Sequence, residues 1–430
     1  MPGTVMLKKS ILTNRTAILI LLALLAGCSS LRQDREVAAS EVVATYIAIA
    51  RASYEDALIS ARVLEDAIDA MLANPSPMTL TYARNAWIAA RVPYQQTEVF
   101  RFGNAVVDEW EVRVNSWPLD EGLIDYTAAS YGEESDINYF YNANIIANQL
   151  LDIGGISVDA AQISPQLLAE TLHQIDGVES NVATGYHVIE FLLWGQDLNG
   201  TNPGAGNRPV TDFSLDNCSN GNCDRRRDYL KAAISLLVAD LEEMTFNWQR
   251  GGPAYEDLIS KGPEGGLATM LTGMGSLAYG ELAGERIRLG LLLNDPEEEH
   301  DCFSDNTHNS HYYDALGIKN IYLGEYERID GSVVSGPSLE DMLLQRSPAI
   351  AAEMRARLES TEFAMNDLLA EAQRGNTFDV LIASNNQEGE AIISNIVDSL
   401  MEETRTIENI IRELNLQNVS IEGSDSLSPL

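Results

Sequence analysis

The chain has 430 residues, of which 28 are Lys or Arg and 64 are Asp or Glu, and its formal net charge is −36. A charge of this sign and size repels nucleic acid and anionic lipid, which excludes nucleic-acid binding and electrostatic attachment of the body to a membrane. The same charge attracts cations without specificity. The length favours two domains over one.

The N-terminal residues have the pattern of an export signal. Lys8, Lys9 and Arg15 accompany an apolar stretch from Ile18 to Leu25 that is too short to span a bilayer. The stretch leads into Leu25-Ala26-Gly27-Cys28, which resembles a bacterial lipobox. We therefore predict a lipoprotein signal peptide, with an uncleaved anchor as the alternative.

Cleavage before Cys28 would remove residues 1–27 and expose a cysteine whose thiol receives a diacylglycerol. Residues 28–35 would then be a lipidated tether, and several acyl chains hold such a tether durably in a membrane. Ser29 differs from the Asp that retains lipoproteins in the inner membrane. We expect a bacterial outer-membrane lipoprotein with its body in the periplasm.

Apolar residues recur at three- and four-residue spacing along most of the remaining chain, which is typical of helices. The expected helices cover residues 36–73, 79–102 with a kink at Pro93, 142–151, 165–195, 224–248, 266–293, 338–374 and 386–416. The segments 195–222 and 295–337 are expected to be long loops.

These elements predict an all-α fold made of two helical-bundle domains. The first domain would cover residues 36–215 and the second residues 216–418, followed by a frayed tail at 419–430. Thr97–Gly103 and Gly284–Gly290 both contain Glu, then Arg three residues later, then Gly. This echo fits a duplication, and chance similarity is the alternative.

Three cysteines follow Cys28. Cys218 and Cys223 lie five residues apart in a loop rich in Gly, Asn and Ser, and a disulfide between them would close a small loop in an oxidising compartment. Because Cys302 is also present, the pairing stays open.

His187 and Glu190 are the most informative residues of the chain. Side chains three residues apart on a helix project from the same face, and an imidazole with a carboxylate makes half of a site for iron or zinc. Their neighbours in the sequence are apolar, so the pair is expected to be buried and to need partners or a function. The alternative is a hydrogen-bonded histidine of the core.

The block Gly185-Tyr-His-Val-Ile-Glu-Phe-Leu-Leu-Trp-Gly-Gln-Asp197 resembles the Gly-x-His-x-x-Glu signature of the imelysin-like family, which comprises iron-regulated bacterial lipoproteins of the periplasm and outer membrane. The resemblance runs from about residue 36 to the C-terminal helix, and it implies two related helical bundles. Further segments that resemble the family are Pro93–Gly103, Trp117–Tyr126, Arg208–Asp212 and Cys302–His308.

Glu98 is the predicted third metal ligand beside His187 and Glu190, contributed by a neighbouring helix as in other helical bundles. Its alternative is an intrahelical ion pair with Arg101. Arg101 or Arg288 would balance the carboxylates and keep them ionised.

Three further residues are candidates for ligand binding. Asp305 and His308 belong to the segment Glu299–His311, which holds three of the five histidines, and Asp197 lies directly after the motif. A site that draws on both halves of the chain would be concave. A solvated loop and ordinary turns are the alternatives.

Three functions fit these patterns. The first is binding of a metal ion, iron or zinc, or of a small ligand, in iron acquisition with iron-uptake proteins as partners. The second is the metallopeptidase activity that the family name implies. Against it, the chain lacks His-Glu-x-x-His and has Phe191 where the inverted motif needs His. The third is an adaptor of a membrane transport system, in which His187 is structural.

Overall fold

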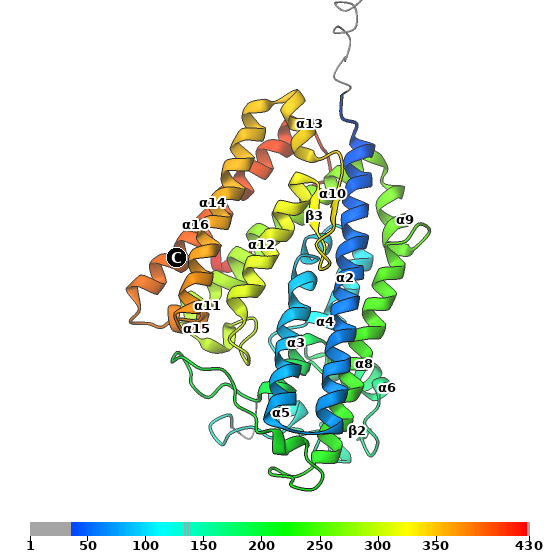
Figure 1. The fold of residues 1–430 in the computed structure, drawn as a ribbon, viewed down its shortest axis with the longest axis vertical. Coiled ribbons are helices and arrows are strands. Elements are labelled where there is room, and N and C mark those ends of the chain that lie inside the picture. Colours follow the sequence, from blue (N-terminus) through cyan, green and yellow to red (C-terminus); the bar gives the residue numbers. More distant parts are fainter. Residues whose placement is uncertain (1–35, 133–134, 136, 428–430) are drawn as a thin grey trace, which may run out of the picture. The chain divides into compact units, whose positions relative to one another are not determined.

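The computed structural model describes residues 36–132, 135 and 137–427 (Figure 1). From Ala38 onward the chain forms one compact unit. Within the described part, no helix combines the length and the apolar character that crossing a membrane requires. The predicted signal peptide and Cys28 lie outside the described residues.

The fold is all-α, as predicted. The helices of eight or more residues are α2 (Ala39–Ala73), α3 (Pro77–Gln95), α4 (Ala105–Asn115), α7 (Tyr186–Trp194), α8 (Cys223–Asn247), α9 (Pro253–Ser260), α10 (Gly262–Ser276), the π-helix η5 (Leu277–Arg288), α12 (Thr307–Leu323), α13 (Leu339–Arg346), α14 (Pro348–Gln373) and α16 (Gln387–Glu413). The shorter helices are η1 (Glu98–Phe100), α5 (Glu121–Ile124), α6 (Pro165–Leu167), η2 (Leu168–Leu172), η3 (Ile175–Gly177), η4 (Val210–Phe213), α11 (Leu289–Leu293), η6 (Pro296–Glu298), α15 (Phe378–Leu381) and η7 (Asp425–Leu427).

The strands of the described part form two small antiparallel hairpins. The paired strands are β1 (Leu150–Ile153) with β2 (Ile156–Asp159), and β3 (Glu325–Glu327) with β4 (Val333–Ser335). Neither hairpin extends into a larger sheet, and the helices build most of the core.

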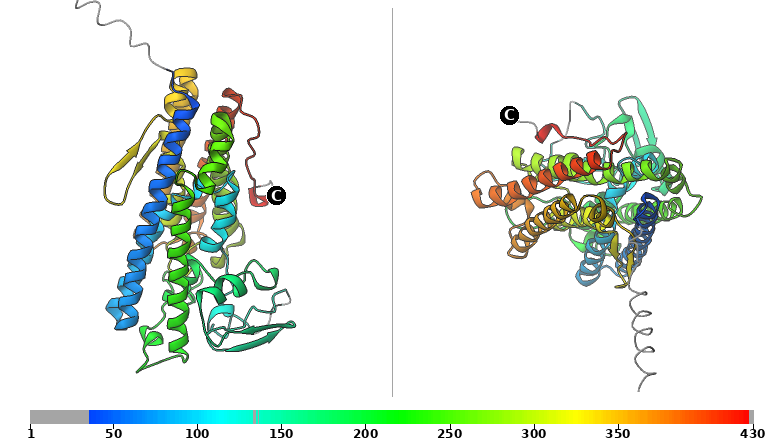
Figure 2. Two further views of the ribbon diagram at one scale, coloured as in Figure 1. Left: turned by 90° about the vertical axis from the view of Figure 1, so that its right-hand side faces the viewer. Right: turned by 90° about the horizontal axis from the view of Figure 1, so that it is seen from above.

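The longest helix, α2, packs along α3 and α8 (Figures 1 and 2). Aromatic side chains fill this contact: the ring of Tyr46 lies 4.9 Å from that of Phe100 and 6.1 Å from that of Trp248, between ring centroids. Because α2 precedes residue 215 and α8 follows it, this packing crosses the predicted domain boundary. The division into two domains and the duplication stay predictions.

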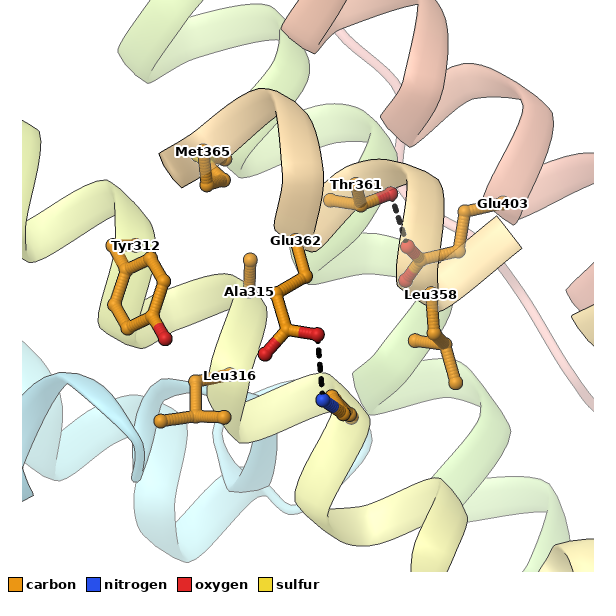
Figure 3. Close-up of a pocket in the computed structure, with 9 residues that line it drawn as sticks. Tyr312, Ala315, Leu316, Leu358, Thr361, Glu362, Met365 and Glu403 are labelled. Atoms are coloured by element: carbon orange, nitrogen blue, oxygen red, sulfur yellow. Dashed lines mark hydrogen bonds and ion pairs between the residues drawn. The ribbon is translucent and has the colours of Figure 1, made fainter. Parts of the chain in front are cut away.

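The C-terminal helices α14 and α16 pack on each other, and α14 also packs on α12. Figure 3 shows residues from both contacts. Between α12 and α14, Lys319 Nζ lies 2.7 Å from Glu362 Oε2. Between α14 and α16, Thr361 donates a 2.6 Å hydrogen bond to Glu403 Oε2. Glu403 is buried, and its Oε1 atom has no hydrogen-bond partner. Burial raises the pKa of Glu403 to about 7.

The described part of the C-terminal tail lies against η5 (Figure 2). The Glu422 N–H donates a 3.0 Å hydrogen bond to Ser276 Oγ. Gly284 lets Ser424 approach, since a Cβ atom on Gly284 would lie 2.3 Å from Ser424 Cβ. Up to Leu427 the tail therefore contacts the body, although none of residues 419–427 is buried. The frayed end stays a prediction.

Two expected helices are wrong in part. Residues 142–151 form turns and enter the first hairpin. The helix expected over 165–195 is interrupted after η2, because Gln174 and Asp176 have positive φ angles of 55° and 62° that end a right-handed helix. Only α7 remains of its second half.

The loop expected over 295–337 contains α12 and the second hairpin. The sequence pattern does not reveal α12 because the first half of its buried face is polar: Thr307, Ser310, His311 and Asp314 are all buried. Apolar periodicity is therefore weak in this helix, although its side chains point into the protein.

Candidate metal centre

The motif helix α7 begins at a glycine that no other residue can replace without strain. Gly185 has φ +93° and ψ −173°, and a Cβ atom there would lie 2.5 Å from the carbonyl oxygen of Val114. The glycine thus lets α7 start against the end of α4. Every residue of α7 is buried, which confirms the expectation that the motif pair is enclosed.

His187 and Glu190 share one face of α7, and His187 Nδ1 lies 3.1 Å from Glu190 Oε2. On its other side, His187 Nε2 lies 3.2 Å from Asn115 Oδ1. Arg91 Nη1 also donates to this amide oxygen, at 2.7 Å, so the oxygen is an acceptor and His187 Nε2 must carry the proton.

The protonation states of the pair follow from burial. Burial lowers the pKa of His187 to about 3, so the imidazole is neutral and Nδ1 offers a lone pair. Burial, and then the nearby Asp301, raise the pKa of Glu190 well above its ordinary value. The proton of Glu190 Oε2 therefore points to His187 Nδ1, while Oε1 accepts from the backbone and hydroxyl of Ser304, at 3.0 and 2.7 Å.

The segment before α12 supplies a second imidazole and a carboxylate. His187 Nδ1 and His300 Nδ1 each lie 3.8 Å from Asp301 Oδ1. One ligand atom from each of His187, His300 and Asp301 lies within 4.8 Å of those of the other two, and all three residues are buried. Two imidazoles and one carboxylate thus converge from distant parts of the chain.

His300 is the member of this group with an unused hydrogen-bonding atom. Its Nδ1 atom is buried and has no hydrogen-bond partner in the described part of the chain. Burial lowers the pKa of His300 well below its ordinary value, so the ring is neutral and able to bind a metal. Its ring packs against those of His187 and Trp117, at 4.8 and 5.5 Å between centroids.

Asp301 already has a positive partner. Arg91 Nη2 donates a 2.9 Å hydrogen bond to Asp301 Oδ1, and Asn306 and Ser310 donate to Oδ2. Burial alone would raise the pKa of Asp301, but Arg91 and these donors lower it below its ordinary value. The carboxylate is therefore ionised at neutral pH.

The predicted third ligand, Glu98, takes part in a separate ion cluster. Arg286 Nη2 lies 2.6 Å from Glu98 Oε2, and the same guanidinium binds Glu281 and Asp314, at 2.8 and 3.0 Å. Because Arg286 takes up its carboxylate, Glu98 makes no contact with His187 in the structure. Asp301 occupies the position that the sequence analysis gave to Glu98.

The two predicted arginines lie near this second cluster. Arg101 pairs with Asp108, Glu111 and Glu281, at 2.8, 3.7 and 3.4 Å. Arg288 is half-buried on η5 and forms no ion pair with any described residue. Neither arginine contacts His187 or Glu190, and Arg91 balances the charge there instead.

The remaining predicted residues lie in other groups. Asp197 and Asp305 come together with Asp379, each with a carboxylate oxygen within 4.8 Å of the others. His308 is half-buried on the first turn of α12, and its Nδ1 atom has no hydrogen-bond partner among the described residues. Sequence reasoning singled out the segment that holds His300 and Asp301 but did not name these two residues, because no local pattern marks which of its polar residues point towards His187. Ligand binding by Asp305 and His308 stays a prediction.

A cleft of about 590 Å³ connects the two clusters. Asn115 and His300 line its side towards the metal centre, and Arg286 and Arg101 line its side towards the ion cluster. The other residues that line the cleft are Glu111, Val112, Ser116, Trp117, Pro118, Gln174, Glu179, Ser180, Glu281, Glu285, Leu289 and Glu298. The buried centre thus has an opening through which a small ligand can reach His300.

Elsewhere, the open question of the disulfide is resolved. Cys218 and Cys223 form a disulfide, and Cys302 is a free, buried cysteine.

The chain is similar to iron-regulated proteins of bacteria. The chain is 23% identical over 323 residues to iron-regulated protein A of Synechococcus elongatus, an alignment that covers 73% of this chain and 71% of that protein. A crystal structure of an iron-regulated protein A precursor from Parabacteroides distasonis is similar with a TM-score of 0.63 at 19% identity, over 87% of this chain and 95% of that one.

A crystal structure of an imelysin-like protein from Psychrobacter arcticum is similar with a TM-score of 0.59 at 17% identity, over 89% of this chain and 98% of that one. These structural likenesses concern the fold. The imelysin family model matches residues 50–407, a range that includes α7 and the segment of His300 and Asp301. The chain therefore belongs to the imelysin family.

Proposed function

We propose that this protein binds a metal ion, iron in preference to zinc, through His187, His300 and Asp301, and that it serves iron acquisition or homeostasis. The observation that carries the proposal is the convergence of two neutral imidazoles and one ionised carboxylate, with both Nδ1 atoms 3.8 Å from Asp301 Oδ1. Two histidines and one carboxylate are a donor set typical of non-haem iron(II). The names of the relatives, iron-regulated proteins, point in the same direction.

The residues present fit a metal ion. The unpartnered Nδ1 atom of His300 is the clearest sign, because a buried nitrogen lone pair without a partner costs free energy that a metal would recover. The lone pair of His187 Nδ1 is held by the proton of Glu190. A metal bound there displaces this proton, so we expect binding to release a proton and to weaken as the pH falls.

The cleft favours a free cation over an anionic chelate. Its arginines, Arg101 and Arg286, are both bound to carboxylates of the protein itself. The carboxylates that line it are Glu111, Glu179, Glu281, Glu285 and Glu298. An acidic opening of this kind raises the local concentration of cations and repels anions.

The experiment compares metal contents. Protein purified without a His tag should contain close to one iron or zinc ion per chain after loading, and His187→Ala and His300→Ala should each lose it. His308→Ala is the matched control, because it removes an imidazole of the same region that lies outside the three ligands. Equal metal content in all four proteins, with unchanged helicity, would overturn the proposal.

We also propose that Cys28 carries the lipid that anchors the protein at the outer membrane, where iron-uptake proteins would be its partners. The lipobox and the acidic body support this placement. Intact-mass analysis of membrane-extracted protein should show the loss of residues 1–27 and added acyl mass, both abolished in Cys28→Ser. A mature chain that still begins at Met1 would contradict it.

A further inference from the structure

We propose a second cation site, for a hard divalent ion such as Ca²⁺, formed by Asp197, Asp305 and Asp379. It goes beyond the proposed function, because none of the three residues belongs to the centre at His187 and its donors are oxygen atoms alone.

The three carboxylates come from three segments. Asp197 lies in the loop after α7, Asp305 in the turn before α12, and Asp379 in the first turn of α15. One carboxylate oxygen of each lies within 4.8 Å of the other two. Asp305 and Asp379 are buried, with exposed fractions of 8% and 0%.

The carboxylate of Asp379 is buried without a cationic partner in the described part of the chain. Burial raises the pKa of Asp379, and the Thr377 hydroxyl and the Val380 N–H beside it offset this rise only in part. Among the described residues, no partner makes a hydrogen bond of normal distance and angle to either oxygen atom of Asp379 or to Asp305 Oδ1. No Lys, Arg or His forms an ion pair with any of the three aspartates among the described residues. Burial raises the pKa of the neighbouring Glu299 well above its ordinary value, and its buried Oε1 atom also has no hydrogen-bond partner among the described residues.

The other buried aspartates of the described part are treated differently, although buried glutamates such as Glu403 also lack an arginine partner. Asp125 lies 2.6 Å from both Arg208 and Arg226, and Asp212 lies 3.2 Å from Arg208. The fold thus pairs its buried aspartates with arginines except at this cluster. A buried carboxylate without a partner costs several kcal/mol in proteins generally, so the missing positive charge points to an ion from solution.

The donor chemistry identifies the class of ion. Ca²⁺ binds six to eight oxygen atoms in flexible geometry, whereas iron and zinc favour nitrogen or sulfur ligands as well. Three aspartates and water offer oxygen only. Burial and the neighbouring Asp379 raise the pKa of Asp305 to about 7, so without an ion this cluster is partly protonated at neutral pH.

Binding would also join three segments of the fold. The ion would tie the loop after the motif helix to the start of α12 and to α15. We therefore expect Ca²⁺ to raise the melting temperature of the metal-free protein.

The test is calorimetric titration of metal-free full-length protein with CaCl₂ in 150 mM salt, beside Asp305→Asn and Asp379→Asn. We expect saturable binding of one ion by the wild type and a loss of affinity on the order of 10- to 100-fold in each variant. Asp216→Asn is the matched control, because it removes one charge from an exposed aspartate and should leave binding unchanged.

The same titration separates this site from the centre at His187. His187→Ala should retain Ca²⁺ binding, and Asp379→Asn should retain iron or zinc. Saturable binding that is equal in wild type and Asp379→Asn would overturn the inference. So would a wild type without Ca²⁺ dependence whose Asp379→Asn variant is more stable, since protons would then neutralise the cluster.

Discussion

Arg91 and Asp301 lie 2.9 Å apart and almost completely buried, although 210 residues separate them in the sequence. The guanidinium also lies over the rings of Trp87, Tyr94 and Tyr186, at 5.1 to 5.5 Å from their centroids. This pair fixes the segment of His300 and Asp301 against α3. It therefore sets the position of two proposed ligands.

Arg91→Ala is expected to destabilise the protein by about 3–5 kcal/mol, because it leaves Asp301 buried without its positive partner. Arg51→Ala is the control, since Arg51 and Glu55 form an exposed pair at 4.0 Å and its loss should change stability by less than about 1 kcal/mol. Urea unfolding followed by circular dichroism measures both. Equal effects of the two substitutions would contradict the role of Arg91.

Gly185→Ala is expected to cost about 3 kcal/mol or more and to lower metal binding, because the new Cβ atom meets the Val114 carbonyl oxygen at a strained φ angle. Gly177→Ala introduces the same methyl group at φ +70° with no atom within 4 Å, and should cost only about 1 kcal/mol. Thermal unfolding of the two variants measures how much of the cost comes from the contact with the Val114 carbonyl oxygen and how much comes from the positive φ angle. A Gly185→Ala protein as stable as Gly177→Ala would refute the close approach at α4.

Glu403→Gln is expected to stabilise the protein above neutral pH. The pKa of Glu403 rises from 4.5 to about 7 on folding, so the folded state binds this proton more tightly than the unfolded chain. The wild type then loses stability as the pH rises from about 4.5 to 7, by up to about 3 kcal/mol, and the neutral amide avoids this loss.

The measurement is the free energy of unfolding of both proteins at pH 4.5 and pH 8. The variant should match the wild type at the lower pH and exceed it at the higher one. Glu408→Gln, an exposed glutamate on the same helix, should have little effect at either pH. A difference between Glu403→Gln and wild type that does not depend on pH would show that ionisation of Glu403 is not its cause.

Peptide hydrolysis is expected to be negligible. Burial raises the pKa of Glu190 well above its ordinary value, so this group holds a proton that it donates to His187, while its Oε1 accepts two hydrogen bonds from Ser304. A protonated carboxyl cannot act as the general base that activates a water molecule. A fluorogenic peptide library incubated with metal-loaded protein measures this. Hydrolysis that disappears in Glu190→Gln and persists with inhibitors of contaminating proteases would show a peptidase.

The sequence predicts those parts of this protein in which local pattern and burial agree. The apolar periodicity of α2, α8 and α16 is strong, and the apolar neighbours of His187 correctly predict its burial. It does not predict α12, because the first half of the inward side of that helix carries polar residues such as Ser310 and Asp314, and the apolar spacing begins only at Ala315.

The residues that contact His187 and Glu98 could not be predicted from the sequence for a related reason. Arg101, three residues after Glu98, suggests a local pair, yet Arg286 takes the carboxylate from 188 positions away. Nothing in the local sequence distinguishes Asp301 from Asp305, because which of them faces His187 depends on how the turn before α12 closes. Such contacts are properties of the tertiary structure.

The two parts of the metal centre, α7 and the segment of His300 and Asp301, lie far apart in the sequence, and this distance decides when the protein can acquire its ion. Glu190 and Ser304, which join these parts, are 114 residues apart, so neither part offers a complete ligand set until the long intervening segment has folded. A chain exported in an unfolded state would cross the cytoplasm without a binding site. The metals of the destination compartment, rather than those of the cytosol, would then decide which ion the folded protein carries.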